Sequence, residues 1–285
     1  MRLLVAYLAT PGGADAVAVG VRLARTLGAD LDICMVVPQD RNAHLLASAP
    51  YNAALVDQSE QWLADARELV PADVTAATHV VISDSIAGGL LGEAERLGSH
   101  ALVVGGSGGG LVGSHSLGSV VNELLHASPI PVVLSPRGAR HSRIERVREI
   151  TCALGTLPGA ADLLDIALSA SATADVALRL VSLVALASTG ETDSENRLRQ
   201  AIEHAQESLD KALAGLPDSV EVTALVAEGT SVETAVNSLD WHDGDLIMVG
   251  SSRLAQPRRL FLGSIAAKML RVLAVPMVVV PRHED

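Results

Sequence analysis

The sequence predicts an α/β protein with two copies of one domain, each a mainly parallel five-stranded sheet with helices on both faces. Three observations point to it: an internal repeat, an alternation of strand and helix patterns, and a glycine-rich loop in each half. Residues 101–137 return as residues 246–282, with Gly118 aligned to Gly263, 145 positions later, and no gap. A self-similar segment of this length indicates a duplicated domain.

The first half alternates continuous apolar runs with segments of helical spacing. Gly28 predicts the end of the first helix, and Asp15 near the start of that helix suits the positive end of the helix dipole. Uninterrupted apolar strands separated by helices are typical of a parallel sheet that is covered on both faces. The pattern predicts strands at 3–9, 31–37, 74–82, 101–105 and 131–135, and helices at 15–27, 54–70, 86–97 and 117–126.

The second half repeats this order of elements. The segment between the two copies is polar and strongly basic, which is typical of a linker. We therefore expect a first domain at 1–136, a linker at 137–147 and a second domain at 148–285, docked as an intramolecular pseudo-dimer. The pattern predicts strands at 148–154, 176–186, 219–227, 245–249 and 276–280, helices at 160–172, 194–214, 231–240 and 263–272, and a loop at 250–261.

Composition excludes several classes of protein. The 285 residues are 49% apolar, which is enough for two domains that each bury a core. No run approaches the roughly 18 apolar residues of a membrane span, and the start of the chain resembles a first strand more than a secretory signal, so we expect a cytoplasmic protein without membrane contact. A net charge of −12 and only five aromatic residues argue against nucleic acid as a partner. Cys34 and Cys152 lie in apolar runs and are expected to be buried thiols.

A glycine-rich loop follows the fourth expected strand, with the spacing Gly105-x2-Gly108-x9-Gly118-Ser119. Ligands bind at the carboxyl ends of parallel strands, and glycine lets the backbone approach a phosphate without a Cβ atom in the way. The amides of Ser119 and Val120 would open the next helix and point at an anion. The alternative is that these residues only cap the helix and fit a crowded loop.

The spacing, the flanking strands and the repeat together resemble the nucleotide-binding signature of the universal stress protein family, over the whole chain and in two tandem copies. The resemblance implies two universal-stress-protein-like domains in a stress-response or regulatory protein that forms homodimers. It also implies an adenine nucleotide as ligand in residues 1–136, with ATP and Mg²⁺ as the expected species. The residues that it places at the nucleotide are Gly105, Ser107, Gly108, Gly118, Ser119, Val120 and Val37.

Two departures from the family pattern concern the first half. Family members that hold ATP usually carry an aspartate near the end of the first strand, where this chain has Leu8 and, in the second copy, Leu154. Between Gly108 and Gly118 the only ionisable residue is His115, so phosphate charge would be balanced by backbone amides and Mg²⁺.

The second loop replaces the second glycine by Arg253. A side chain there would crowd a backbone that approaches phosphate, yet the arginines of this loop supply positive charge that the first loop lacks. Anion recruitment by bidentate arginine and a solvated basic loop both remain open. A second site would comprise Gly250, Arg253, Gly263 and Ser264.

An enzymatic reading rests on the turn after the first strand. Residues 10–16 look like the Ser-Gly-Gly-x-Asp-Ser loop of ATP pyrophosphatases, but Pro11 and Ala16 stand where both serines belong. The scattered histidines show no paired metal-ligand spacing. We therefore expect a protein that binds a nucleotide and either does not hydrolyse it or hydrolyses it very slowly. The alternatives are a nucleotide-free module for dimer or partner contacts and, third, a pyrophosphatase-like enzyme.

Overall fold

A computed structural model describes residues 1–38, 49–106, 115, 117–155, 160–186, 192–216, 221–251, 260 and 262–281. The α/β prediction is confirmed, with each half built from five strands and its covering helices. The first half comprises β1 (Arg2–Ala6), α1 (Pro11–Leu27), β2 (Asp30–Pro38), α2 (Ala49–Glu68), β3 (Ala76–Ser83), α3 (Ile86–Leu97), β4 (Ala101–Gly105), α4 (Ser119–Ala127) and β5 (Val132–Ser135). The second half comprises β6 (Glu149–Ala153), α5 (Ala160–Ala174), β7 (Ala177–Ala185), α6 (Thr192–Ala214), β8 (Val222–Gly229), α7 (Val232–Asn237), β9 (Asp245–Gly250), α8 (Ser264–Met269) and β10 (Met277–Val280).

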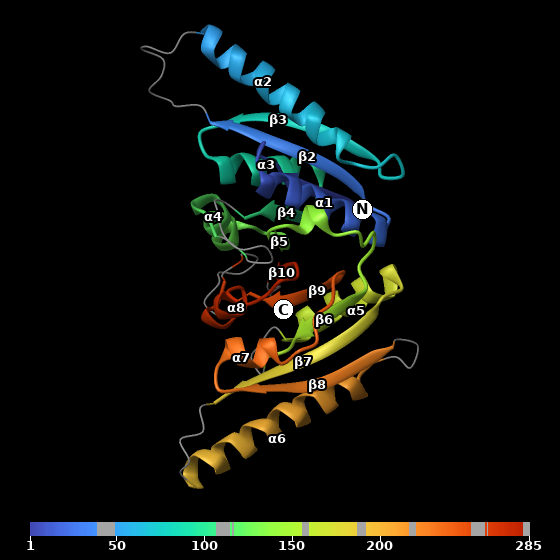
Figure 1. Cartoon of the computed structure of the whole chain (residues 1–285), viewed down its shortest axis with the longest axis vertical. Helices are drawn as coiled ribbons and strands as arrows, with labels where there is room; N and C mark the ends of the chain where they lie inside the picture. Colours follow the sequence, from blue (N-terminus) through green and yellow to red (C-terminus); the bar gives the residue numbers. More distant parts are fainter. Residues whose placement is uncertain are drawn as a thin grey trace.

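The two halves form one continuous sheet of ten strands in the order β3-β2-β1-β4-β5-β10-β9-β6-β7-β8. Pairing is parallel within each half and antiparallel only between β5 and β10, where Val133 lies opposite Val278 and Leu134 opposite Met277. Figure 1 shows α4 and α8 together on one face of the sheet, α1 and α5 on the other face, and α2 and α6 at opposite ends of the molecule. The halves therefore dock as a pseudo-dimer through their last strands.

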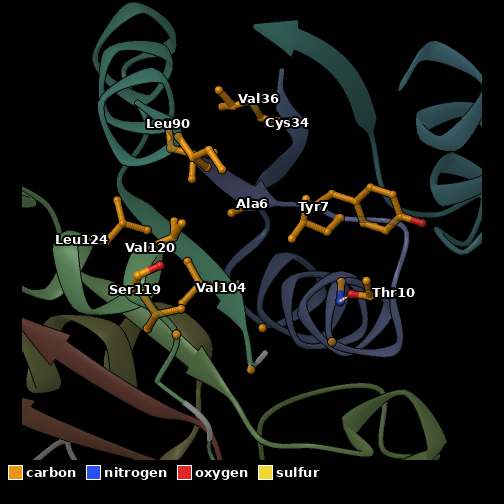
Figure 2. Close-up of a pocket in the computed structure, with 18 of the residues that line it drawn as sticks. Ala6, Tyr7, Thr10, Cys34, Val36, Leu90, Val104, Ser119, Val120 and Leu124 are labelled. Atoms are coloured by element: carbon orange, nitrogen blue, oxygen red, sulfur yellow. Dashed lines mark hydrogen bonds between the residues drawn. The ribbon is translucent and has the colours of Figure 1, made fainter. Parts of the chain in front are cut away.

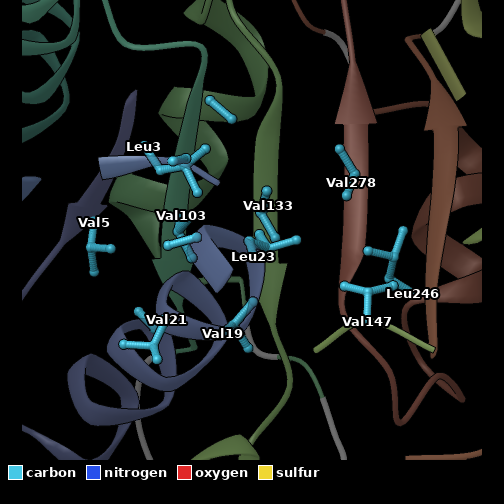
Figure 3. Close-up of a cluster of buried hydrophobic side chains, with 14 of the residues drawn as sticks. Leu3, Val5, Val19, Val21, Leu23, Val103, Val133, Val147, Leu246 and Val278 are labelled. Atoms are coloured by element: carbon cyan, nitrogen blue, oxygen red, sulfur yellow. The ribbon is translucent and has the colours of Figure 1, made fainter. Parts of the chain in front are cut away.

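The apolar core crosses the seam on both faces of the sheet. Because successive strand residues point to opposite faces, Val133 and Val278 enter one buried cluster while Leu134 and Met277 enter the other. Figure 3 shows the first cluster, with side chains of α1 and β4 on one side of the seam and Leu246 on the other. Separating the halves would therefore expose part of both clusters. Each Å² of apolar surface exposed in this way would cost about 25 cal/mol.

Helix α1 starts at Pro11, four residues earlier than the apolar spacing suggested. Thr10 caps it, since its hydroxyl oxygen accepts from the Gly13 amide at 3.3 Å, and proline is well suited to the first helical position. Asp15 is consequently not in the first turn, which corrects our expectation that it faces the helix dipole. Its carboxylate is 2% exposed and accepts the amides of Gly138 and Arg140, each at 3.0 Å.

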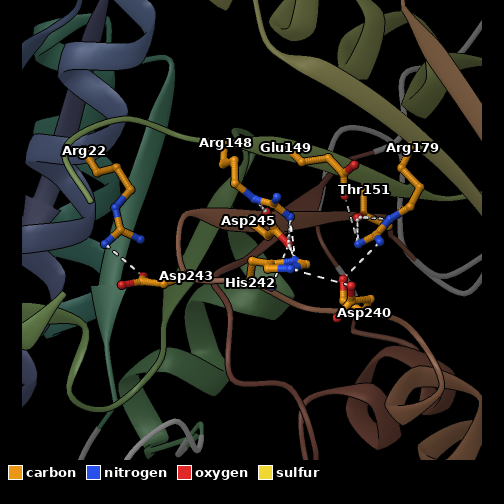
Figure 4. Close-up of polar contacts among 9 residues, drawn as sticks. All are labelled: Arg22, Arg148, Glu149, Thr151, Arg179, Asp240, His242, Asp243 and Asp245. Carbon is orange, nitrogen blue, oxygen red and sulfur yellow. Dashed lines mark hydrogen bonds and ion pairs between the residues drawn. The ribbon is translucent and has the colours of Figure 1, made fainter. Parts of the chain in front are cut away.

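The segment 137–147, expected as a polar linker, packs along the whole length of α1 and contains a 3-10 helix, Ala139–His141. Near the middle of α1, Arg22 donates to the Ile144 carbonyl oxygen at 3.1 Å, and near its end the Thr26 hydroxyl accepts the Val147 amide at 2.8 Å. Arg22 also lies 3.6 Å from Asp243 of the second half (Figure 4). The connection is thus an ordered part of the interface between the halves.

We predict that Asp15→Ala lowers the free energy of unfolding by about 2 to 3 kcal/mol, because two backbone donors and a guanidinium lose their shared buried acceptor. Arg140→Ala should cost about 1 kcal/mol, since it removes the partly exposed Arg140 Nη1 contacts, to Asp15 at 2.9 Å and to the Pro11 carbonyl oxygen at 3.3 Å, and leaves both amides bonded. Urea denaturation of the full chain measures both. Equal losses would mean that the two amide bonds contribute nothing.

Equivalent strand positions of the two halves carry ion pairs of opposite polarity. Arg2 of β1 lies 2.8 Å from Asp32 of β2, whereas Glu149 of β6 lies 3.1 Å from Arg179 of β7. Figure 4 shows the Arg179 guanidinium joined to Glu149, Thr151 and Asp240. The same guanidinium lies 5.0 Å from the Trp241 ring centre. The duplicated sheets thus share a backbone plan while their buried polar contacts have diverged.

Candidate functional site

A cavity of about 620 Å³ lies in the first half, at the carboxyl ends of β1, β2 and β4 and beside the N-terminal ends of α1 and α4. One end is lined by the buried side chains of Cys34, Val36 and Leu90, and the other by Gly118 and the exposed Ser119 (Figure 2). This is the position at which open α/β sheets bind ligands.

The open end of the cavity meets the first turn of α4. Gly118 has an extended backbone and leaves the helix without a side-chain cap, while the Gly118 carbonyl oxygen accepts the Asn122 amide at 2.9 Å. The first amides of an α-helix have no partner within the helix, and the dipole adds partial positive charge there. Ser119 and Val120, two predicted site residues, line the cavity at this point. The arrangement suits an anionic group such as a phosphate.

Gly105 allows a close contact between the end of β4 and the first turn of α1. A Cβ atom at Gly105 would lie 1.9 Å from the Gly12 carbonyl oxygen, and one at Gly12 would lie 2.1 Å from the Gly106 carbonyl oxygen. Both Gly12 and Gly105 line the cavity, so their contact shapes its wall. In the second half, a Cβ atom at Gly250 would meet, among the described residues, only Leu163 at 3.8 Å, an ordinary contact.

The described lining residues include no lysine, arginine, histidine, aspartate or glutamate. The Thr10 hydroxyl is used by the helix cap, and Figure 2 shows the Tyr7 hydroxyl directed away from the other lining side chains. The pKa of Tyr7 is raised by burial and, to a smaller extent, by Asp65. Burial raises the pKa of the Cys34 thiol to about 12, so this sulfur stays protonated and is a poor nucleophile. The described part of the lining is therefore uncharged and largely apolar.

The structure brings four predicted site residues together at the cavity, Gly105, Gly118, Ser119 and Val120. Val37 is not a lining residue, but its neighbour Val36 is, because alternate residues of β2 face opposite sides of the sheet. Ser107, Gly108 and Arg253 lie outside the described residues. In the second half, Gly263 precedes α8, which begins at Ser264 and spans six residues, also without a side-chain cap.

His115, the only ionisable residue between Gly108 and Gly118, is bonded to the second half. Its Nε2 atom lies 3.0 Å from the Val275 carbonyl oxygen. Burial lowers the pKa of His115 to about 4, more than the bond to Val275 raises it. The ring is therefore neutral at physiological pH and is not part of the cavity lining.

The turn that starts α1 belongs to the site but was not predicted as part of it. Pro11, Gly12 and Gly13 line the cavity, although we had considered this turn only as an imperfect pyrophosphatase loop. The signal was available in principle, because β1 and β4 pair in parallel and the segments after their carboxyl ends must meet.

Over the described parts of the chain, no three His, Cys, Asp or Glu side chains gather as a metal-binding group. In the same residues no helix combines the length and the apolar character that crossing a bilayer requires. The cysteines are buried as predicted, and burial raises the pKa of Cys152, like that of Cys34, to about 12.

Comparison with known proteins agrees with the two-domain fold. The universal stress protein family matches residues 1–136 and again residues 146–281. Universal stress proteins of Mycobacterium bovis and of Mycobacterium tuberculosis are each 28% identical over 296 aligned positions, covering 99% of this chain and 100% of the relative.

Solved structures show the same fold at lower sequence identity. A universal stress protein from Archaeoglobus fulgidus is 16% identical with a TM-score of 0.71, covering 99% of this chain and 98% of its own. A protein described as a putative universal stress protein from Pseudomonas aeruginosa is 16% identical with a TM-score of 0.59, covering 99% and 93%. With a family match in each half and relatives that span its full length, the chain belongs to the universal stress protein family as a tandem two-domain member.

Proposed function

We propose that the protein is a regulatory nucleotide-binding protein that holds one adenine nucleotide, ATP with Mg²⁺, in the cavity of the first half. The observation that supports this most is the difference between the two ends of the cavity. It offers an apolar, buried end at Cys34, Val36 and Leu90 and an uncapped helix start at Ser119.

Each end suits one part of the ligand. A flat aromatic base gains from burial against apolar side chains, and a polyphosphate gains from the amides and the dipole at the start of α4. The described lining supplies no positively charged side chain. The remaining negative charge of the phosphates would therefore be neutralised by Mg²⁺, which prefers phosphate oxygens and water as ligands.

We infer that the protein binds the nucleotide without turning it over. Amides that bind the ground state and the transition state equally well give no acceleration. None of the described lining side chains is a general base or a carboxylate, and His115 is engaged by Val275. Hydrolysis should therefore stay well below about 1 s⁻¹, the slow end of ordinary enzyme rates.

A second candidate function is a nucleotide-free interaction module. It is favoured by two apolar side chains near the cavity mouth, Leu8 and Leu117, which are 54% and 41% exposed. In that case the mouth would receive a partner. A homodimer of this chain would need a surface other than the β5 edge, because β10 of the same chain already pairs with it.

Because the described lining is uncharged, we expect the ribose hydroxyls to contribute little to affinity. We expect 2′-deoxy-ATP to bind within about threefold of ATP, because no described lining side chain is a carboxylate able to accept hydrogen bonds from the ribose hydroxyls. Parallel calorimetric titrations of the full chain measure both affinities. A loss of tenfold or more for the deoxy nucleotide would show that a hydroxyl-recognising group exists.

The proposal is tested by mass spectrometry of the small molecules released when the protein, purified without added nucleotide, is denatured. An adenine nucleotide in near-stoichiometric amount is the expected result. A different small molecule recovered in that amount would contradict it. Recovery of no small molecule, together with no binding of added ATP, would favour the interaction module.

A further inference from the structure

The loop that leads into α4 is tied to the opposite half of the protein at His115. A carbonyl oxygen can only accept, so His115 donates its Nε2–H to the Val275 carbonyl oxygen at 3.0 Å. Val275 is 5% exposed and lies two residues before β10. The bond thus joins the loop of the first half to a buried, fixed point of the second half.

The second half makes the reciprocal contact. Leu260, at the position equivalent to His115 in the repeat, donates its amide to the Ser128 carbonyl oxygen at 3.1 Å. Ser128 in turn donates its hydroxyl to the Ile130 carbonyl oxygen at 2.7 Å, ahead of β5. His115 and Leu260 therefore each bond to the opposite half, because the antiparallel seam sets the end of β5 beside the start of β10.

The contact at His115 affects the cavity through helix α4. His115 lies three residues before Gly118, the N-cap of α4, and the first turn of α4 lines the cavity. Further along α4, Leu124 is fully buried in the cluster that also contains Leu270 of the second half. The start and the body of α4 are thus both held by contacts with the second half.

We propose that His115 is a positioning residue for the nucleotide site, which the second half completes by holding His115 through the Val275 carbonyl and so fixing the start of α4 against the cavity. The expected change in nucleotide affinity rests on the proposed nucleotide function. The expected change in the order of α4 rests only on the contacts of His115 and Leu260 with the opposite half.

The test uses the full chain with His115→Leu, which cannot donate, and His115→Gln, which keeps a side-chain donor. Calorimetric titration with Mg-ATP should show about a tenfold loss of affinity for His115→Leu, equivalent to one lost hydrogen bond. His115→Gln should stay within about threefold of the wild type. His204→Leu, which changes an exposed histidine of α6, is the matched control and should bind normally. If His115→Leu does not fold, His115→Ala replaces it.

Hydrogen exchange without nucleotide provides the second readout. The peptide spanning α4 should exchange several-fold faster in His115→Leu than in wild type and His115→Gln, while the peptides of α6 keep their rates. Unchanged exchange in α4, or a wild-type affinity in folded His115→Leu, would overturn the positioning role. Wild-type protein that binds no Mg-ATP would contradict the proposed function alone, and the exchange experiment would still decide on His115.

Discussion

Gly105→Ala is expected to lower the free energy of unfolding by about 3 kcal/mol, the largest stability loss that we predict for a single methyl group. The added Cβ atom would lie 1.9 Å from the Gly12 carbonyl oxygen and 2.6 Å from its carbon. Both neighbours are backbone atoms, so relief requires that the turn at the start of α1 moves away from β4. The same movement would open the cavity wall and weaken nucleotide binding.

The repeat supplies a matched control at Gly250. Among the described residues, the nearest atom to a Cβ there belongs to Leu163, at 3.8 Å, so Gly250→Ala should change stability by less than about 1 kcal/mol. Urea denaturation of both variants measures the difference. Equal, small losses would show that the end of β4 and the first turn of α1 do not pack against each other as described.

Ser119→Glu is expected to weaken Mg-ATP binding by at least about tenfold without loss of stability. A carboxylate in the first turn of α4 interacts favourably with the helix dipole, by about 0.5 kcal/mol. The same charge repels a phosphate held at that turn, by about 1 to 4 kcal/mol at a separation near 4 Å. Binding and folding should therefore move in opposite directions, which a structural defect does not produce.

Ser264→Glu makes the same change at the start of α8 in the second half. It should leave affinity for Mg-ATP within about twofold of the wild type, because the nucleotide is assigned to the first half. Calorimetry gives the affinities and thermal unfolding gives the stabilities. A loss of binding in Ser264→Glu, with normal binding in Ser119→Glu, would move the site to the second half.

Local patterns in the sequence were sufficient for the elements of the fold. The apolar spacing of each strand and helix is a property of adjacent residues, and the repeat supplied the same answer twice. The antiparallel seam was beyond their reach, because no local pattern states that Leu134 will lie opposite Met277. The early start of α1 was signalled by Thr10 and Pro11, but Asp15 suggested a later one, and its true partners lie in the linker.

The candidate site was predictable only in part, for the same reason. The glycine spacing located Gly105, Gly118 and Ser119 at one cavity. The partner of Gly105 is Gly12, however, and that of His115 is Val275, and both contacts join residues far apart in the sequence. A single sequence shows which residue types occur, whereas such pairs depend on how the strands are ordered.

Calorimetric titration of the full chain with Mg-ATP tests the nucleotide assignment most directly. We predict one nucleotide per chain, a dissociation constant below about 1 mM, and loss of that binding in Ser119→Glu but not in Ser264→Glu. No binding up to millimolar nucleotide, two nucleotides per chain, or binding that Ser119→Glu leaves unchanged would contradict a nucleotide site at the start of α4.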